Sequence, residues 1–278
     1  MKQRLLVAAV GVPLLLVLLL VCPPWATVLL CCAITGVAVY ELLHTGAKQI
    51  PYSVYAMTIL LAALQVVYLS SGSDALAVGS VSSVTMLRWY FVILLFFCAV
   101  VRFKKENSLS FSDLAVALTA GIVLPAMYGC IALLRKDGSF GKAYVLAPFI
   151  IAFLGDSFSM LGGSLFGKKK LAPAVSPNKT WAGFFAGPVG SAGGMVLLGL
   201  AARAAWGYAP NYAMLLLCGV VGNLFGQLGD LSTSFIKREA GVKDYSRLFL
   251  THGGMLDRFD STLFIAPVVY FFVQGGLL

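Results

Sequence analysis

Residues 229–260 read GDLSTSFIKREAGVKDYSRLFLTHGGMLDRFD and lie between two strongly apolar segments of the chain. This stretch holds five acidic and five basic side chains, although the whole chain of 278 residues has only 11 acidic and 20 basic ones. Charge of this density beside a bilayer is costly unless it serves a function at the membrane surface. We therefore take the stretch as the candidate site and the apolar segments as the scaffold that holds it.

The composition predicts an all-α, polytopic integral membrane protein. The chain is 60% hydrophobic and 11% charged with a mean hydropathy of +0.92, whereas soluble domains carry about a quarter charged residues. About nine transmembrane helices are expected, because nine apolar segments approach the roughly 20 residues that a spanning helix needs. These segments are 5–22, 25–43, 54–70, 87–102, 112–134, 144–166, 180–201, 212–229 and 262–278.

The distribution of basic residues predicts the orientation. With nine spans and the amino terminus in the cytoplasm, 15 of the 20 basic residues fall in cytoplasmic connections, as the positive-inside rule requires. The charged stretch then faces the cytoplasm, where nucleoside triphosphates are available. The net charge of +9 sits in these connections, so anionic lipids and phosphate substrates, not nucleic acid, are the expected partners.

We expect two regions along the chain. Residues 1–140 would form a frame of about five amino-terminal helices, and residues 141–278 would form the catalytic region. Segment 212–229 carries a stripe of four glycines at helical spacing, which favours close helix packing in lipid. This stripe is as compatible with a homodimer as with a monomer. Its members are Gly219, Gly222, Gly226 and Gly229.

Three carboxylates are candidates for catalysis and for binding a metal ion. If residues 230–237 are helical, Asp230, Ser234 and Lys237 share one face. Asp257 and Asp260 are three residues apart in a helix expected to begin after the Gly-Gly pair at 253–254. Carboxylate oxygens with phosphate oxygens suit Mg²⁺, so these three acids predict a site for one or two cations.

A structural interpretation of two of these acids stays open. Asp257 and Asp260 are also typical of a helix amino terminus, where acidic side chains are favoured, and either one can pair with Arg258.

A second polar stretch, residues 166–181, reads FGKKKLAPAVSPNKTW. Ser176 followed by Pro177 predicts a helix start whose free N–H groups would bind phosphate, with Lys179 in the same turn. The lysines at 168–170 fit an anchor on anionic lipid instead.

Two further residues have two interpretations each. Asp156 lies within an apolar segment, where an acid is a functional candidate or a structural hydrogen-bonding group between helices. His252 either orients a ligand or caps the Gly-Gly turn. The sequence contains no Gly-x-Ser-x-Gly, Walker A or Rossmann glycine pattern.

The charged stretch resembles the signature of the phosphatidate cytidylyltransferase (CDP-diacylglycerol synthase) family. That signature is Ser-x-apolar-Lys-Arg, four residues, Lys-Asp, then a loop to His-Gly-Gly-apolar-x-Asp-Arg-apolar-Asp. It matches here at 234–238, 243–244 and 252–260 with the spacing intact. The lysine-rich segment before Trp181 is also similar. The chain departs from the family at Leu250-Thr251, Tyr245-Ser246 and Ala182. We expect the loop at 243–252 to differ in shape, which bears on lipid preference or rate more than on the reaction class.

The resemblance implies a reaction between CTP and phosphatidic acid that requires Mg²⁺ and gives CDP-diacylglycerol and pyrophosphate. Asp230, Asp257 and Asp260 would then hold one or two cations, with Lys237 beside them as a catalytic residue. The substrate-binding residues would be Ser176, Lys179, Ser234, Arg238, Lys243 and His252.

Two other functions remain compatible with the sequence. A CTP-dependent polyprenol kinase would also place metal and nucleotide at a membrane face, but it would transfer the γ-phosphate to an alcohol. A transporter of an anionic solute would use the charges as a pathway, although they cluster on one side instead of crossing the bilayer.

Overall fold

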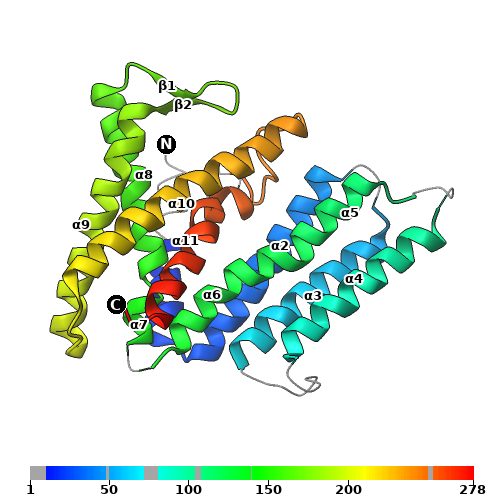
Figure 1. Cartoon of the computed structure of the whole chain (residues 1–278), viewed down its shortest axis with the longest axis horizontal. Helices are drawn as coiled ribbons and strands as arrows, with labels where there is room; N and C mark the ends of the chain where they lie inside the picture. Colours follow the sequence, from blue (N-terminus) through cyan, green and yellow to red (C-terminus); the bar gives the residue numbers. More distant parts are fainter. Residues whose placement is uncertain (1–10, 48–49, 72–80, 104–107, 139, 250–252) are drawn as a thin grey trace. The chain divides into compact units, whose positions relative to one another are not determined.

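The computed structural model describes residues 11–47, 50–71, 81–103, 108–138, 140–249 and 253–278. These residues are almost entirely helical, with a single two-stranded sheet among them. The chain divides into two compact units (Figure 1). The first unit contains Met1–Leu133 and Glu239–Arg258, and the second contains Leu134–Arg238 and Phe259–Leu278.

Seven helices in the described part of the chain are long and apolar enough to cross a bilayer. They confirm the all-α, membrane-protein prediction, and each overlaps one of the nine apolar segments. The number nine stays a prediction, because the helix at Gly11–Val21 is shorter and the last helix is not among the seven. The seven spans are Pro24–Gly46, Tyr52–Ser71, Ser83–Val101, Phe111–Lys136, Gly141–Phe166, Trp181–Trp206 and Tyr212–Glu239.

The first unit is built around α2 (Pro24–Gly46), α3 (Tyr52–Ser71) and α4 (Ser83–Val101). Helix α3 packs against both α2 and α4. The next span consists of α5 (Phe111–Leu118), the π-helical turn η2 (Thr119–Val123) and α6 (Leu124–Lys136). A short π-helical turn η1 (Val17–Val21) precedes α2.

The buried amide of Gln65 in this unit is paired across helices. Gln65 of α3 donates to the carbonyl of Gly121 in η2 (2.6 Å) and accepts from Arg88 Nε of α4 (3.1 Å). These bonds satisfy side chains that would otherwise be costly to bury in an apolar helix bundle.

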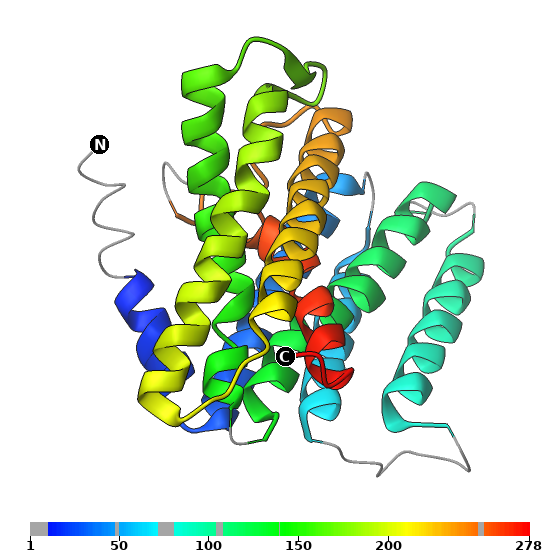
Figure 2. The same ribbon diagram turned by 60° about the vertical axis from the view of Figure 1, so that its left-hand side comes forward.

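The second unit contains α7 (Gly141–Tyr144), α8 (Ala147–Phe166), α9 (Trp181–Trp206), α10 (Tyr212–Glu239) and most of α11 (Leu256–Gln274). Helices α8 and α9 lie side by side (Figure 2) and are joined by a hairpin of β1 (Lys170–Ala172) and β2 (Ser176–Thr180). The core between these helices is apolar and includes Ile151, Met195, Leu215, Ile265 and Val269.

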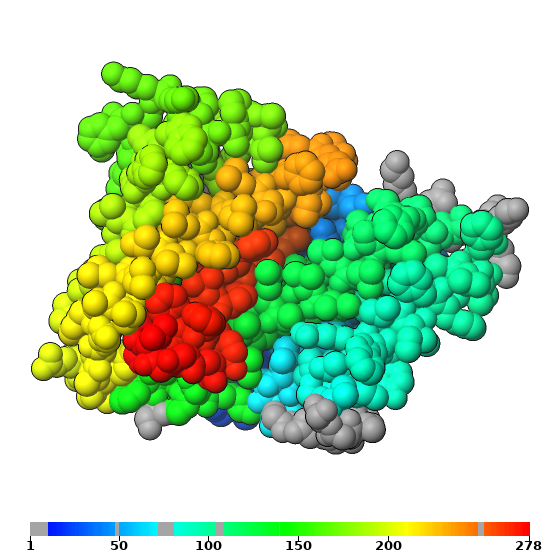
Figure 3. All heavy atoms as spheres, viewed as in Figure 1, coloured from blue at the N-terminus to red at the C-terminus, as the bar shows by residue number. Residues whose placement is uncertain are grey.

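The glycine stripe on α10 brings three helices into close contact. A Cβ atom on Gly219 would lie 2.8 Å from Cα of Ala192 in α9, so the two backbones nearly touch there. A Cβ atom on Gly229 would meet Phe264 and the carbonyl of Asp260 in α11 at 2.6 and 2.8 Å. Figure 3 shows α11 packed along α10. Close helix packing within one chain therefore explains why glycine occurs at these positions of α10.

The predicted helix start at Ser176-Pro177 is wrong. Ser176 begins strand β2, which pairs antiparallel with β1 in the register Ala172↔Ser176 and Lys170↔Thr180. Helix α9 begins at Trp181, and Thr180 is its N-cap because its hydroxyl accepts from Gly183 N (3.2 Å). The serine-proline pair is thus used in a hairpin, while a threonine four residues later provides the cap.

Candidate active site

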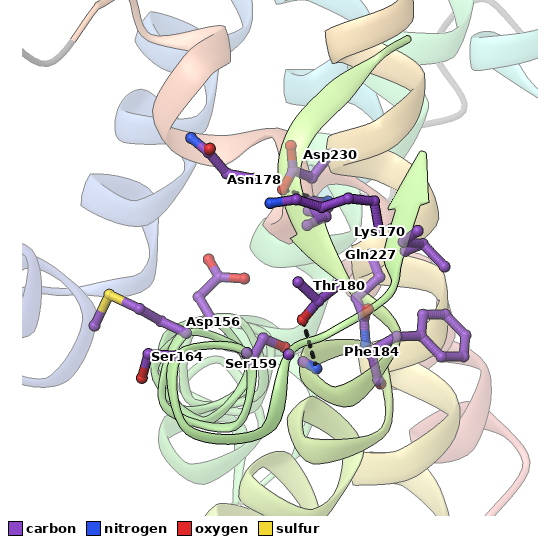
Figure 4. A pocket seen from close by; sticks show the side chains of 15 residues that line it. Asp156, Ser159, Ser164, Lys170, Asn178, Thr180, Phe184, Gln227 and Asp230 are labelled. Atoms are coloured by element: carbon purple, nitrogen blue, oxygen red, sulfur yellow. Dashed lines mark hydrogen bonds and ion pairs between the residues drawn. The ribbon is translucent and has the colours of Figure 1, made fainter. Parts of the chain in front are cut away.

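A polar cavity of about 460 Å³ opens in the second unit between α8, the hairpin, the start of α9 and α10. Asp156 of α8, Asn178 of β2 and Asp230 of α10 approach it from three sides (Figure 4). Its volume lies in the range of roughly 300–1,000 Å³ that is typical of small-ligand sites. Other polar side chains in its lining are Ser159, Ser164, Lys170, Lys179, Thr180 and Gln227.

An ion pair crosses this cavity from the hairpin to α10. Lys179 Nζ lies 2.6 Å from Asp230 Oδ2, and both side chains are partly exposed, 23% and 30% respectively. Ser234, one helical turn further along α10, donates to Asp230 Oδ1 (3.3 Å). This bond confirms that Asp230 and Ser234 share one helix face. The Lys179 ammonium nitrogen is itself buried, so a ligand entering the cavity reaches it only by displacing the Asp230 carboxylate or by binding beside the pair.

Two further polar side chains of α10, Asn223 and Gln227, lie in its apolar part, before Asp230. Gln227 Nε2 donates to Asn223 Oδ1 (2.6 Å) and to the carbonyl of Phe184 in α9 (3.1 Å). Both amides are buried, so these bonds offset the cost of removing them from water. They fix the side chain of Gln227 at the cavity wall.

A second carboxylate lies close to Asp230. Burial of its carboxyl group, together with the charge of Asp230, raises the pKa of Asp260 to about 7, and the charge of the buried Lys237 opposes this shift. Asp156 also raises the pKa of Asp260. Thr233 of α10 donates to Asp260 Oδ2 (3.4 Å). Two acids that repel each other in this way favour a bound cation, which lets both be ionised.

Asp230 and Asp260 suit a Mg²⁺ site that two carboxylates and the phosphates of a substrate form together. Among the described residues, no three His, Cys, Asp or Glu side chains converge as a ready-made metal site. Mg²⁺ is commonly held by only one or two carboxylates, with substrate phosphates completing its coordination. Asp230 and Asp260 would supply such carboxylates, with the phosphates of a substrate as the further ligands.

The predicted metal ligand Asp257 already binds backbone groups. It is in the first turn of α11, and its Oδ2 accepts from the backbone N–H of Tyr245 (2.8 Å) and of Gly254 (2.9 Å). Asp257 and the exposed Lys243 belong to the first unit. His252 lies outside the described residues.

Other predicted residues are at the hairpin. Arg238 Nε donates to the carbonyl of Val175 between the two strands (3.3 Å), which connects the end of α10 to the hairpin. Ser176 is in β2 beside this contact.

Sequence reasoning missed part of the cavity lining. Lys170, interpreted as part of a lipid anchor, lines the cavity, as do Ser159 and Asn178. The signal available for Asn178 is its position next to Lys179. Asp156, for which both roles remained open, also lines the cavity.

Comparisons with known proteins agree with this site. Residues 2–275 match the model of the cytidylyltransferase family. The chain is 31% identical to the phosphatidate cytidylyltransferase of Bacillus subtilis over 271 residues, which is 98% of this chain and 97% of that protein. It is 40% identical over 167 residues to the phosphatidate cytidylyltransferase of Staphylococcus epidermidis, covering 59% of this chain and 61% of that one.

The chain therefore belongs to the cytidylyltransferase family. The match to the staphylococcal relatives spans about three fifths of their length.

Proposed function

We propose that the protein is a phosphatidate cytidylyltransferase, which transfers the cytidylyl group of CTP to phosphatidic acid and releases pyrophosphate. The observation that carries this proposal is the Lys179–Asp230 ion pair inside a polar cavity next to the family motif. Its support comes from family membership and from two relatives whose names state this activity.

The chemistry of the reaction suits the residues of the cavity. An oxygen of the lipid phosphate attacks the α-phosphorus of CTP, and the bond from that phosphorus to the bridging oxygen of the β-phosphate breaks. The attacking oxygen is already anionic at neutral pH, so no general base is needed. The principal requirements are in-line placement and screening of the negative charges.

Each charged residue has a role in this scheme. Lys179 and Lys237 would bind phosphate oxygens. Ser234 donates to Asp230, and Arg238 connects the hairpin to α10. Asp230 and Asp260 would hold Mg²⁺, which supplies charge neutralisation between the triphosphate and the lipid phosphate. Metal binding by Asp257, a second cation, and substrate contacts from Ser176, Arg238, Lys243 and His252 stay predictions.

The proposed setting is the cytoplasmic face of the bilayer. The apolar helices and the family identify an integral membrane protein. With the amino terminus in the cytoplasm, the acyl chains of phosphatidic acid stay in the lipid while its headgroup enters the cavity.

The position of a radioactive label tests the reaction directly. Purified protein in mild detergent receives phosphatidic acid, Mg²⁺ and CTP labelled with ³²P at either the α- or the γ-phosphate, with EDTA as a control. We expect metal-dependent transfer of α-label into the chloroform layer and release of γ-label as pyrophosphate. Transfer of γ-label to an added polyprenol would identify a kinase instead, and folded protein that transfers neither label would contradict the proposal.

A further inference from the structure

Glu41, near the end of α2, has a buried carboxylate with an unexpected set of partners. It is 1% exposed in a helix that sequence analysis assigned to the frame. Its Oε1 accepts from Ser246 Oγ (2.6 Å) and from Met255 N (2.9 Å), and its Oε2 accepts from Leu256 N (2.8 Å). A buried carboxylate is tolerated only when such donors replace water. All of these residues belong to the first unit.

The two backbone donors are at the beginning of α11. The first N–H groups of a helix have no partner within the helix, and a nearby Ser, Thr, Asp or Asn normally caps them. Met255, which precedes the first residue of α11, has no side-chain oxygen that can do so. Glu41 takes this role from more than 200 residues away, and its negative charge also suits the positive end of a helix.

Each glycine of the Gly-Gly pair in the motif lies against a carboxylate, Gly253 against Asp257 and Gly254 against Glu41. A Cβ atom on Gly254 would overlap the carboxylate of Glu41, so a larger residue would push that carboxylate out of its present position. Gly253 has a φ of 77°, which favours glycine, and a Cβ atom on it would lie 2.8 Å from Asp257 Oδ2. Glycine is therefore favoured at position 253 by the backbone angle and at position 254 by the nearby carboxylate.

Glu41 and Asp257 also close the same loop. Asp257 holds the N–H groups of Tyr245 and Gly254, while Glu41 holds the neighbouring Ser246 and Met255. Ser246 in turn accepts from Leu248 N (3.2 Å). Residues 245–246 and 254–255 are therefore tied together through two carboxylates.

We propose that Glu41 is a positioning residue for the reaction: it fixes the start of α11 and the base of the motif loop through the N–H groups of Met255 and Leu256 and the hydroxyl of Ser246. The kinetic consequence rests on the proposed function, because the first turns of α11 carry Asp257 and Asp260. Small displacements of such groups are costly, since a misplacement of about 1 Å lowers rates by up to about 100-fold.

The test compares Glu41→Gln with a matched control, Asp113→Asn. Asp113 is likewise buried in the first unit, and its Oδ2 accepts from Ser110 N (3.0 Å) and Ser110 Oγ (2.7 Å) at the start of α5. Glutamine at position 41 keeps one acceptor oxygen but turns donors toward backbone N–H groups. Ser246→Ala serves as a milder variant that leaves both backbone bonds to Glu41 in place.

Hydrogen exchange measured by mass spectrometry gives a readout that needs no activity. We expect Glu41→Gln to speed exchange in the peptide covering 253–258 by at least about tenfold, because hydrogen bonds to a charged group are lost there. Asp113→Asn should leave that peptide unchanged and affect only the start of α5. Ser246→Ala should speed exchange at 245–249 by at least about threefold, because Leu248 N also loses its acceptor there. If Glu41→Gln does not fold, exchange at 253–258 in Glu41→Asp, which keeps the charge on a shorter side chain, decides the matter.

Kinetics then separates positioning from general stability. Glu41→Gln and Asp113→Asn are both assayed at temperatures where each is fully folded. We expect Glu41→Gln to lower kcat/KM for CTP by at least about tenfold. Asp113→Asn should keep a value near that of the wild type. Unchanged exchange at 253–258, or equal kinetic losses in both variants, would overturn the proposal. If the wild-type protein has no cytidylyltransferase activity, the proposed function fails, and the exchange data still decide whether Glu41 fixes the start of α11.

Discussion

Lys179 and Asp230 combine two tasks in one contact. Their ion pair joins the hairpin to α10 and also presents opposite charges to the cavity. The pair is only partly exposed, so the cost of removing its charges from water offsets part of their attraction. Its value in the proposed reaction is that an ammonium group for phosphate and a carboxylate for a cation are held next to each other before substrate arrives.

Removal of the ammonium group should therefore weaken CTP binding. We predict that Lys179→Met lowers kcat/KM for CTP by at least about 30-fold, because a charge-assisted hydrogen bond to phosphate is lost. The matched control is Lys169→Met, an exposed lysine of the same segment that does not line the cavity. It should stay within about twofold of wild type. Equal effects of the two substitutions would mean that the cavity does not bind the nucleotide.

For single residues, the sequence predicted contacts correctly where helical spacing alone determines which side chains meet. Asp230 and Ser234 are four residues apart in a segment that continues a predicted helix, and they are hydrogen bonded. Glu41 was not predicted, because its partners are backbone groups more than 200 residues away. A sequence pattern shows which side chains can accept hydrogen bonds, but not which distant N–H groups will need them.

The elements that shape the cavity are a helix with a glycine stripe and a hairpin. The stripe lets α10 approach α9 and α11 closely, which places its polar residues beside those of the hairpin. The helices were predictable because each span needs about 20 apolar residues. The hairpin was not, since its lysines and Ser-Pro pair equally suit a lipid anchor followed by a helix cap.

Close approach at the stripe gives a stability prediction. In Gly219→Ala the new methyl group would contact the backbone of Ala192, which cannot move aside as a side-chain end can. We expect a loss of about 1–3 kcal/mol in unfolding free energy, typical of overpacking, visible as a lower midpoint of thermal unfolding in detergent.

Gly193→Ala on α9 is the control, because its new methyl group meets no atom within 4 Å. Alanine favours helices over glycine by about 1 kcal/mol, so this variant should be as stable as wild type or more so. If Gly219→Ala were equally stable, the close contact of α9 and α10 would be disproved.

The whole chain forms two compact units, and residues of the charged stretch contribute to both. Residues 239–258 belong to the unit that contains the amino-terminal helices, so those helices support the motif loop as well as spanning the bilayer. Composition predicted the membrane-protein class, but hydropathy holds no information on which helices pack with a polar loop.

Orientation can be tested by protease access to the hairpin. Its lysines at 168–170 are exposed, and the proposed topology places them in the cytoplasm. Trypsin should cut there in inverted vesicles and leave this site intact in right-side-out ones, as read from fragment masses. Cleavage only in right-side-out vesicles would reverse the topology.

The most direct test of the account measures transfer of α-label from CTP to phosphatidic acid by the wild type, by Asp230→Asn and by Asp137→Asn. Asp137 is an acid of the same unit that does not line the cavity. We predict Mg²⁺-dependent transfer by the wild type and by Asp137→Asn, and a loss of at least about 100-fold in Asp230→Asn, because the cavity loses both its cation ligand and the partner of Lys179. Wild-type rates in well-folded Asp230→Asn would contradict the claim that this cavity is the active site.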